Sequence, residues 1–449
     1  MEKKAENVRA LVVGLGRSGK AAAEALVHMG AEVDAYDGTE DAEKREWAKS
    51  IGAAISFGDR PAHVKDYDML VVSPGVPTDK DFIKEAAADG AEVIGELELA
   101  YRYGKGRYVA ITGTNGKTTT TTLVGEIFKA AGIKTEVVGN IGVAVMTKAM
   151  DATDDTWLVT ECSSFQLDTT KTFKPVVSAL LNITPDHLDR HKTMENYAAA
   201  KAKIFANQDE TQYFVYNDDD ELCKAEAKKC KATLVPFSRK RQLDFGAFVK
   251  DGNIVIRNRK VDYVICAVDK LKIPGLHNLE NALAAAAIAF FSGIDMDTIS
   301  RTIASFSGVA HRIEDCGTVD GVKYINDSKG TNPDAAIKAV ISFKNIILIA
   351  GGYDKGASYD EFIAAFDGRV KELVLMGVTA QKIKAAAEAA GFTHIHMVAD
   401  MKEAVEKSHA LAKPGDVVLL SPACASWDMY KKFEDRGDDF RNRVKDLMK

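Results

Sequence analysis

The chain has 449 residues, too many for one hydrophobic core, so we expect two to four domains. Hydrophobic residues make up 46% and charged residues 28% of the sequence, as in ordinary globular proteins, and a net charge of −6 argues against nucleic acid or an anionic membrane as the main partner. The longest apolar run, 282–291, is too short for a membrane span and reads as a buried helix. Scattered cysteines without a CxxC pair favour reduced thiols, so we expect a cytoplasmic protein.

Short β-branched runs alternate with alanine-rich helical runs along nearly the whole chain, which predicts parallel sheets flanked by helices. Strands are expected at 9–13, 31–36, 68–72, 108–112, 157–161, 177–184, 213–217, 323–325, 346–350, 372–376, 394–398 and 416–420. Helices are expected at 18–29 and 279–292, a linker at 101–107 and an antiparallel hairpin at 248–256. The sequence therefore predicts an α/β protein of three domains: a Rossmann-like domain at 1–104, a central domain with a small antiparallel patch at 105–308, and a Rossmann-like domain at 309–449.

Glycine and polar residues directly follow the predicted strands in all three segments. They are Gly14, Asp37, Ser73, Gly113, Glu161, His187, Asp327, Gly351 and Ser421. In open parallel sheets, ligands bind at the carboxyl ends of the strands. Three such edges predict a large cleft for several substrates.

The segment Gly113–Thr118, Gly-Thr-Asn-Gly-Lys-Thr, joins a predicted strand to a predicted helix. Backbone N–H groups and the helix N-terminus can cradle phosphates, Lys117 adds positive charge, and Thr118 can ligate Mg²⁺. The common form of this loop has a glycine where Ile111 stands here. A turn that needs glycine only for its geometry is the alternative, but the pattern indicates that the protein binds a nucleoside triphosphate.

A second glycine-rich loop, Gly14–Gly19, follows the first strand and opens a helix, and Asp37 ends the next strand. This is the pattern of dinucleotide-binding loops, although it specifies only a close approach to a pyrophosphate. A nicotinamide dehydrogenase would explain this loop but would leave the phosphate-binding segment Gly113–Thr118 without a use.

The compressed loop TGTNGKTT resembles the ATP loop of the Mur ligases and folylpolyglutamate synthetases. The resemblance continues in the same order through 161–166, 182–190, 197–201, 277–281, 311–312 and 326–329. Within the Mur ligase family, residues 421–437 resemble most closely the member that adds D-glutamate, and no DNPR-type segment of the diaminopimelate- and lysine-adding members is found. A folate ligase is the nearest alternative; the N-terminal domain and residues 421–437 argue against it.

The resemblance implies an ATP-dependent ligase of peptidoglycan precursor synthesis. It would add D-glutamate to UDP-N-acetylmuramoyl-L-alanine through an acyl phosphate, with a UDP-binding first domain, an ATP-binding P-loop domain in the centre and a C-terminal domain for the incoming amino acid. It also implies ATP, two Mg²⁺ ions and a lysine carbamylated by CO₂. We expect a monomer whose partners are small molecules, with no nucleic acid and no membrane span.

The resemblance also assigns roles to individual residues. Catalytic roles fall to Lys117, Glu161, His187, Lys201 and Lys329. ATP binding falls to Gly113, Thr114, Asn115, Gly116, Lys117, Thr118, Thr119, Asn278, Asn281, Arg312 and Asp327. The sugar nucleotide is assigned to Arg17, Ser18, Asp37, Ser73, Pro74, Gly75, Asn140, Ser163, Gln166 and His187, with uracil contacts at Gly38 and Thr39 left open. D-Glutamate is assigned to Thr331, Lys355, Ser426, Trp427 and Phe433. The metal is assigned to Thr118, Glu161, His187 and Lys201 as a carbamate.

Three of these residues can each be explained without a catalytic or metal-binding role when they are considered alone. Glu161 could be a solvated strand end, His187 a bystander in a helix-capping segment, and Lys201 an ordinary solvated lysine on a helix. A non-catalytic ATP-binding switch protein would need none of the three. Their joint presence in the order of the family favours the ligase.

Overall fold

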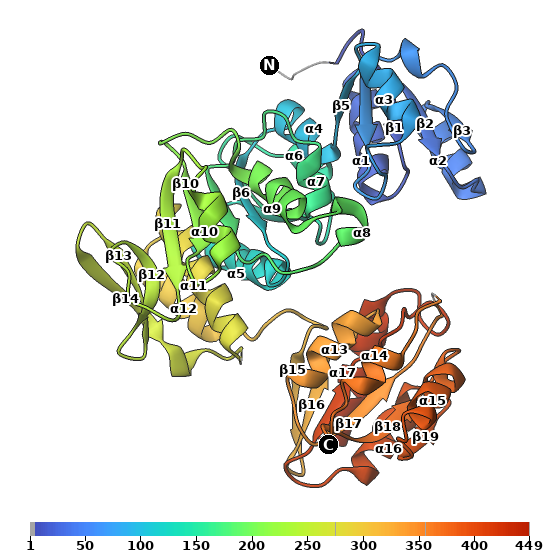
Figure 1. Ribbon diagram of the computed structural model, residues 1–449, viewed down its shortest axis with the longest axis vertical. Helices are drawn as coiled ribbons and strands as arrows, with labels where there is room; N and C mark the ends of the chain where they lie inside the picture. The colour runs from blue at the N-terminus through green and yellow to red at the C-terminus, as the bar shows by residue number, and fades with distance from the viewer. Residues whose placement is uncertain (1–4, 274, 355, 449) are drawn as a thin grey trace. The chain divides into compact units, whose positions relative to one another are not determined.

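The computed structural model describes residues 5–273, 275–354 and 356–448. Its described residues form three sheets flanked by helices, which confirms the predicted α/β class (Figure 1). The chain divides into two compact units, Met1–Phe306 with two sheets and Ser307–Lys449 with one. The predicted domain boundary between residues 104 and 105 lies inside the first unit and stays a prediction.

The first sheet has the strand order β3-β2-β1-β4-β5, and all its pairings are parallel. Its elements are β1 (Arg9–Val13), α1 (Arg17–His28), β2 (Glu32–Asp37), α2 (Ala42–Ile51), β3 (Ala54–Phe57), η1 (Val64–Asp66), β4 (Met69–Val72), α3 (Asp81–Ala88), β5 (Glu92–Ile94) and α4 (Glu96–Tyr103). Because the chain leaves β1 toward β2 on one side and returns to β4 on the other, a crevice is expected where their carboxyl ends diverge.

The predicted linker at 101–107 is wrong in its extent. Helix α4 continues to Tyr103, and the next strand begins at Arg107. The ring of Tyr101 packs edge-on against Tyr108 and Phe173, with ring centres 5.6 and 5.4 Å away. This aromatic packing gives the end of the helix a buried partner that a solvated linker would lack.

The second sheet has the order β14-β13-β12-β11-β10-β9-β6-β8-β7; it is parallel from β12 to β7, and only β12, β13 and β14 pair antiparallel. Its strands are β6 (Arg107–Thr112), β7 (Thr135–Gly139), β8 (Trp157–Glu161), β9 (Val177–Leu180), β10 (Tyr213–Asn217), β11 (Thr233–Ser238), β12 (Gly246–Lys250), β13 (Asn253–Asn258) and β14 (Val261–Ala267). The antiparallel patch and its hairpin are confirmed, with the turn at Asp251 and Gly252, both at positive φ.

The helices beside this sheet contain many of the residues predicted for ATP binding and catalysis. They are α5 (Lys117–Ala130), α6 (Val145–Ala149), α7 (Ser164–Asp168), α8 (Leu188–His191), α9 (Met194–Ala202), η2 (Lys203–Phe205), α10 (Glu221–Ala227), η3 (Val268–Lys270), α11 (Leu276–Phe291) and α12 (Met296–Ser305). The predicted buried helix is confirmed as α11, which packs on α5 and on several strands of the sheet. Within the described residues, no helix is long and apolar enough to cross a membrane.

The third sheet has the order β15-β16-β20-β17-β18-β19, with only β15 and β16 antiparallel. Its elements are β15 (Glu314–Val319), β16 (Val322–Asn326), α13 (Pro333–Ile341), β17 (Ile346–Ala350), α14 (Asp360–Ala364), β18 (Val370–Leu375), α15 (Ala380–Ala389), β19 (Ile395–Met397), α16 (Met401–Leu411), β20 (Val417–Leu420) and α17 (Phe433–Leu447). The strands predicted for this segment are confirmed to within two residues at each end.

Candidate active site

The phosphate loop, residues 113–118, runs from the end of β6 into the first turn of α5, which confirms the predicted strand–loop–helix order. Gly116 has φ 81°, and a Cβ atom there would lie 2.3 Å from Oδ1 of Asn281 on α11. Glycine is therefore required both by the left-handed backbone and by the close approach of α11. The first turn of α5 offers N–H groups without intrahelical partners, as an anion site needs.

Asn182 holds this loop from the chain that follows β9. Its Oδ1 accepts a hydrogen bond from the N–H of Asn115 at 2.8 Å, and its Nδ2 donates to the carbonyl of Asn115 at 3.1 Å. The hydroxyl of Thr114 accepts from the N–H of Thr184 at 3.0 Å and lies 3.2 Å from the hydroxyl of Tyr197. Strand β9 therefore ends at Leu180 and not at the predicted Thr184, because these residues bind the loop and not a neighbouring strand.

Two lysines converge on the carbonyl of Gly113. Lys117 Nζ donates to it and to the carbonyl of Thr114, and Lys201 Nζ donates to it as well, all at 2.8 Å. Lys201 is 1% exposed and lies 4.5 Å from the centre of the Tyr197 ring, so its reading as a solvated lysine is wrong. Burial, helped by Lys117, lowers the pKa of Lys201 to about 7.

Glu161 ends β8, the strand next to β6, and Ile111 is its partner in the register. Its side chain is 2% exposed, so its reading as a solvated strand end is wrong. Oε1 accepts a hydrogen bond from Asn140 Nδ2 at 2.8 Å, whereas Oε2 is buried and has no hydrogen-bond partner among the described residues. A buried carboxylate oxygen without a donor costs free energy, and a cation would satisfy it.

His187 caps the N-terminus of α8 with φ 53°, and its side chain makes no capping hydrogen bond. Its ring is exposed and lies 4.9 Å from the ring of Phe165 and 6.4 Å from that of Tyr197. Tyr197 also borders Lys201, so His187 and Lys201 are neighbours of one aromatic ring. In the part of the chain that the structure describes, no group of three or more His, Cys, Asp or Glu side chains could hold a metal ion. The predicted metal site would not form such a group, because only two of its four ligands, Glu161 and His187, are of these residue types.

A pocket of about 410 Å³ opens at the carboxyl ends of β1, β2 and β4. It is lined by Gly14, Leu15, Gly16, Arg17, Ser18, Asp37, Ser73, Pro74, Gly75 and Val76. Asp37 accepts hydrogen bonds from the N–H groups of Leu15 and Thr39 at 2.8 and 3.1 Å. Burial acts to raise the pKa of Asp37, but these bonds and Lys44 outweigh it and hold the pKa below its usual value. The predicted Asp37 thus also shapes the glycine-rich loop.

The remaining residues predicted for the sugar nucleotide lie outside this pocket. Asn140 contacts Glu161, as described above. Ser163 and Gln166 form a capping box at the start of α7, in which the Ser163 hydroxyl accepts from the N–H of Gln166 at 3.2 Å. The structure therefore places the predicted residues in two groups, one at the glycine-rich loop and one beside Glu161.

In the second unit, Asp327 follows β16 and is buried. Its Oδ2 accepts from the hydroxyl of Ser421 at 2.8 Å and its Oδ1 from the N–H of Ile313 at 3.3 Å. Burial raises the pKa of Asp327 to about 7 against the opposing effect of Ser421 and Arg312. Lys329, two residues on, has its Nζ 5.8 Å from the centre of the Phe433 ring.

Three of the residues predicted for D-glutamate, Ser426, Trp427 and Phe433, lie in the chain after β20. Ser426 is buried, and its hydroxyl has no hydrogen-bond partner among the described residues. Phe433 begins α17, Thr331 is half-buried, and Trp427 is 61% exposed with its ring 5.5 Å from Tyr353. Lys355 lies outside the described residues.

Sequence reasoning gave no role to Arg436, which joins the chain that follows β16 to the chain that follows β20. It is buried, and its Nε donates to the Ser328 hydroxyl at 3.0 Å. Its other nitrogens donate to the carbonyls of Ser328, Cys424 and Ala425. A fully buried arginine on neutral partners is costly, and burial lowers the pKa of Arg436 to about 10. The signal in the sequence was its position inside the segment that resembles the family.

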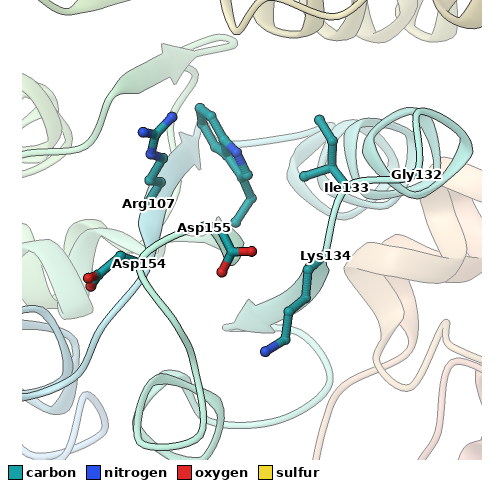
Figure 2. A pocket seen from close by; sticks show the side chains of 7 residues that line it. Arg107, Gly132, Ile133, Lys134, Asp154 and Asp155 are labelled. Atoms are coloured by element: carbon teal, nitrogen blue, oxygen red, sulfur yellow. The ribbon is translucent and has the colours of Figure 1, made fainter.

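Another pocket, of about 500 Å³, lies at the amino-terminal ends of β6, β7 and β8. Figure 2 shows side chains that line it. Arg107 and Trp157, which line it, are the first residues of β6 and β8, and Lys134 directly precedes β7. The phosphate loop and Glu161 stand at the other ends of these strands. This pocket is therefore not part of the predicted site.

Comparison with known proteins agrees with this geometry along the chain. Residues 8–95 match the N-terminal domain described as Mur ligase MurD-like, residues 111–289 the Mur ligase middle domain, and residues 311–424 the Mur ligase glutamate ligase domain. The UDP-N-acetylmuramoylalanine–D-glutamate ligase of Caldanaerobacter subterraneus subsp. tengcongensis is 49% identical, with 98% of each chain covered. The ligase of the same name from Clostridioides difficile is 47% identical, again with 98% of each chain covered.

Solved structures show the same fold at low sequence identity. The UDP-N-acetylmuramate-alanine ligase of Thermotoga maritima is 20% identical with a TM-score of 0.55, and 98% of this chain and 100% of that chain are covered. A pseudomurein peptide ligase type C from Methanothermus fervidus is 18% identical with the same TM-score and the same coverage. With full-length relatives at nearly half identity, the chain belongs to the Mur ligase family.

Proposed function

We propose that the protein is an ATP-dependent amide ligase that joins D-glutamate to UDP-N-acetylmuramoyl-L-alanine through an acyl phosphate, in peptidoglycan precursor synthesis. The observation that carries the proposal is the arrangement around the phosphate loop. Lys117 and Lys201 meet at the Gly113 carbonyl. Glu161, at the end of the neighbouring strand, has a buried carboxylate oxygen with no hydrogen-bond partner among the described residues. Full-length relatives named for D-glutamate support the choice of amino acid.

ATP would be held by the phosphate loop. The N–H groups at the start of α5 and the Lys117 ammonium would bind the β- and γ-phosphates, while Asn182 keeps the loop in shape. The carboxylate of the L-alanyl group would attack the γ-phosphorus, and ADP would leave. The positive charge of Lys117 would stabilise the charge that develops on the transferred phosphoryl group.

The residues beside the loop fit Mg²⁺. Glu161 Oε2 is a hard oxygen that has no donor among the described residues, and the hydroxyl of Thr118 stands in the first turn of α5. When bound, Mg²⁺ supplies positive charge next to the phosphates. We assign Glu161, Thr118, His187 and a modified Lys201 to hold two such ions.

Lys201 has the surroundings that carbamate formation requires. Its nitrogen is buried against a carbonyl and a phenol ring, and the lowered pKa leaves a substantial fraction as neutral amine near neutral pH. The neutral amine would add to the carbon of CO₂ and release one proton. The product is an anion beside the Lys117 ammonium, and the two opposite charges attract each other.

The sugar nucleotide would bind with its diphosphate at the Gly14–Gly19 loop, in the pocket that Arg17 and Ser18 line. D-Glutamate would bind in the second unit, near Ser426 and Phe433. We further propose that the chain has domains at 1–104, 105–308 and 309–449, and acts as a cytoplasmic monomer. Its scattered free cysteines support a cytoplasmic location.

An omission experiment tests this function. Purified protein with Mg²⁺ and ATP should release ADP continuously only when UDP-N-acetylmuramoyl-L-alanine and D-glutamate are both present. Replacing D-glutamate with L-glutamate, L-lysine or diaminopimelate should reduce the rate to background. Equal turnover with any of these would show that the amino acid has been assigned wrongly.

A further inference from the structure

Helix α4 carries two buried glutamates to which no role has been given above. Glu96 is 2% exposed and Glu98 is 0% exposed, two residues apart on the same helix. Buried carboxylates are rare in proteins unless a partner or a task retains them. The two carboxylates have different partners. Those of Glu96 lead to residues of the candidate active site, whereas those of Glu98 do not.

Glu96 holds the start of α6. Its Oε1 accepts a hydrogen bond from the N–H of Met146 at 2.5 Å. Its Oε2 is buried without a hydrogen-bond partner among the described residues, and Arg17 is the nearby cation that opposes the effect of burial on its pKa. The carboxylate therefore fixes the end of the loop that precedes α6.

That loop, residues 140–144, connects the two halves of the predicted site. At its first residue, the N–H of Asn140 donates to the carbonyl of Glu161 at 2.9 Å, and Nδ2 donates to Glu161 Oε1. In its middle, the carbonyl of Gly142 accepts from Nη1 of Arg17, which lines the pocket at the glycine-rich loop. Gly139, just before it, has φ 104°, and a Cβ there would lie 2.3 Å from the Glu161 carbonyl. The backbone at this point is thus tightly placed against β8.

We propose that Glu96 is a positioning residue: through the start of α6 it holds loop 140–144 so that Asn140 orients Glu161 and Gly142 orients Arg17. Glu96 itself touches neither ligand. The inference rests on the proposed function, because it takes Glu161 as a metal ligand and Arg17 as a sugar-nucleotide contact. It predicts that one buried side chain on α4 sets the affinity for both Mg²⁺ and the sugar nucleotide but not for ATP.

Glu98 provides a matched control. Its carboxylate accepts hydrogen bonds from the N–H groups of Lys171, Thr172 and Phe173 at 2.9, 2.8 and 3.1 Å. It also binds Arg102 on its own helix at 2.6 Å. These contacts fix a different segment, between α7 and β9, and none of them reaches loop 140–144. Loss of Glu98 should therefore reduce stability without changing ligand affinity.

The test compares Glu96→Leu, Glu96→Gln and Glu98→Gln by calorimetric binding of UDP-N-acetylmuramoyl-L-alanine, by the Mg²⁺ concentration for half-maximal rate, and by the KM for ATP. Leucine leaves the Met146 N–H unpaired, so we expect the sugar nucleotide to bind about ten-fold or more weakly and the Mg²⁺ requirement to rise by a similar factor. Glutamine keeps a neutral acceptor, and we expect about a three-fold loss. Glu98→Gln should bind both like the wild type, and the KM for ATP, measured at saturating Mg²⁺, should stay unchanged throughout.

Two results would overturn the positioning role. One is wild-type affinity for the sugar nucleotide and Mg²⁺ in the Glu96 variants, with Glu96→Gln deciding if the leucine variant does not fold. The other is an equal loss in Glu98→Gln, which would indicate a general loosening of α4. A wild-type protein that does not bind the sugar nucleotide at all would instead refute the proposed function.

Discussion

Replacing Lys201 by methionine should make the protein more stable and almost inactive at the same time. Methionine keeps most of the length of the lysine stem and is a comparable helix former, so α9 and its packing should persist. What disappears is a nitrogen that is buried against the Gly113 carbonyl and the Tyr197 ring. Without this nitrogen no carbamate can form.

The magnitude follows from the pKa of Lys201, which burial lowers from 10.5 to about 7. The folded state loses its proton near pH 7 and the unfolded state near pH 10.5, so the cost of the buried ammonium builds up as the pH falls from 10.5 to 7 and is constant below. This difference corresponds to about 5 kcal/mol at neutral pH. Methionine loses one hydrogen bond, of about 1–2 kcal/mol, so the net gain in stability is about 3 kcal/mol.

Thermal unfolding in CO₂-free buffer without ATP or Mg²⁺ measures the stability, and ADP release measures the activity. We expect Lys201→Met to unfold at a higher temperature and to lose activity by roughly 10²–10³-fold or more. In Lys201→Ala, added acetate should restore part of the rate, because a small carboxylate can take the place of the missing oxygens. A methionine variant with full activity would show that Lys201 has only a structural role. A lower unfolding temperature would show that the buried ammonium does not destabilise the folded protein.

Three further predictions concern other parts of the site. Asn182→Ala removes both hydrogen bonds to Asn115 and should raise the KM for ATP about ten-fold while sugar-nucleotide binding is unchanged; an unchanged KM would mean that the loop keeps its shape alone. Burial raises the pKa of Glu96 from 4.5 to about 7, so between these pH values the folded state keeps a proton that the unfolded state has lost. The contribution of Glu96 to the free energy of unfolding should therefore fall by about 3 kcal/mol as the pH rises from 4.5 to 7. Over this pH range the unfolding temperature of the wild type should fall relative to that of Glu96→Gln, because glutamine does not titrate. A difference that stays constant with pH would contradict the raised pKa of Glu96. Ser426→Ala should raise the KM for D-glutamate several-fold but leave acyl-phosphate formation, trapped by borohydride reduction, at the wild-type level; loss of the trapped product would move Ser426 out of the amino-acid pocket.

Elements with a strong hydrophobic pattern could be predicted from the sequence. Strand β17 is continuous apolar sequence and was predicted at its observed bounds, and the apolar run of α11 was recognised as a buried helix. Strand β15 was not predicted, because its polar sequence contains Gly317 and a shift in register near that residue. An edge strand of this kind has no apolar alternation to detect.

The residues of the candidate site also differ in how far they could be predicted from the sequence. The glycines and lysine of the phosphate loop are local in sequence and could be recognised there. The burial of Lys201 and of the Glu161 carboxylate depends on segments far apart in the chain, so the sequence alone allowed both side chains to be interpreted as solvated. The anchoring contact of Glu96 with Met146 spans fifty residues and has no local signature.

The most direct test of the account is the identity of the product. The protein is incubated with ATP, Mg²⁺ and UDP-N-acetylmuramoyl-L-alanine in an equimolar mixture of D-glutamate, L-glutamate, L-lysine and diaminopimelate, with D-glutamate isotopically labelled. Mass spectrometry should find one new amide, the sugar nucleotide extended by labelled glutamate, with one ADP formed for each amide. A product that carries unlabelled glutamate or another amino acid, or ADP formation without any amide, would contradict the proposed function.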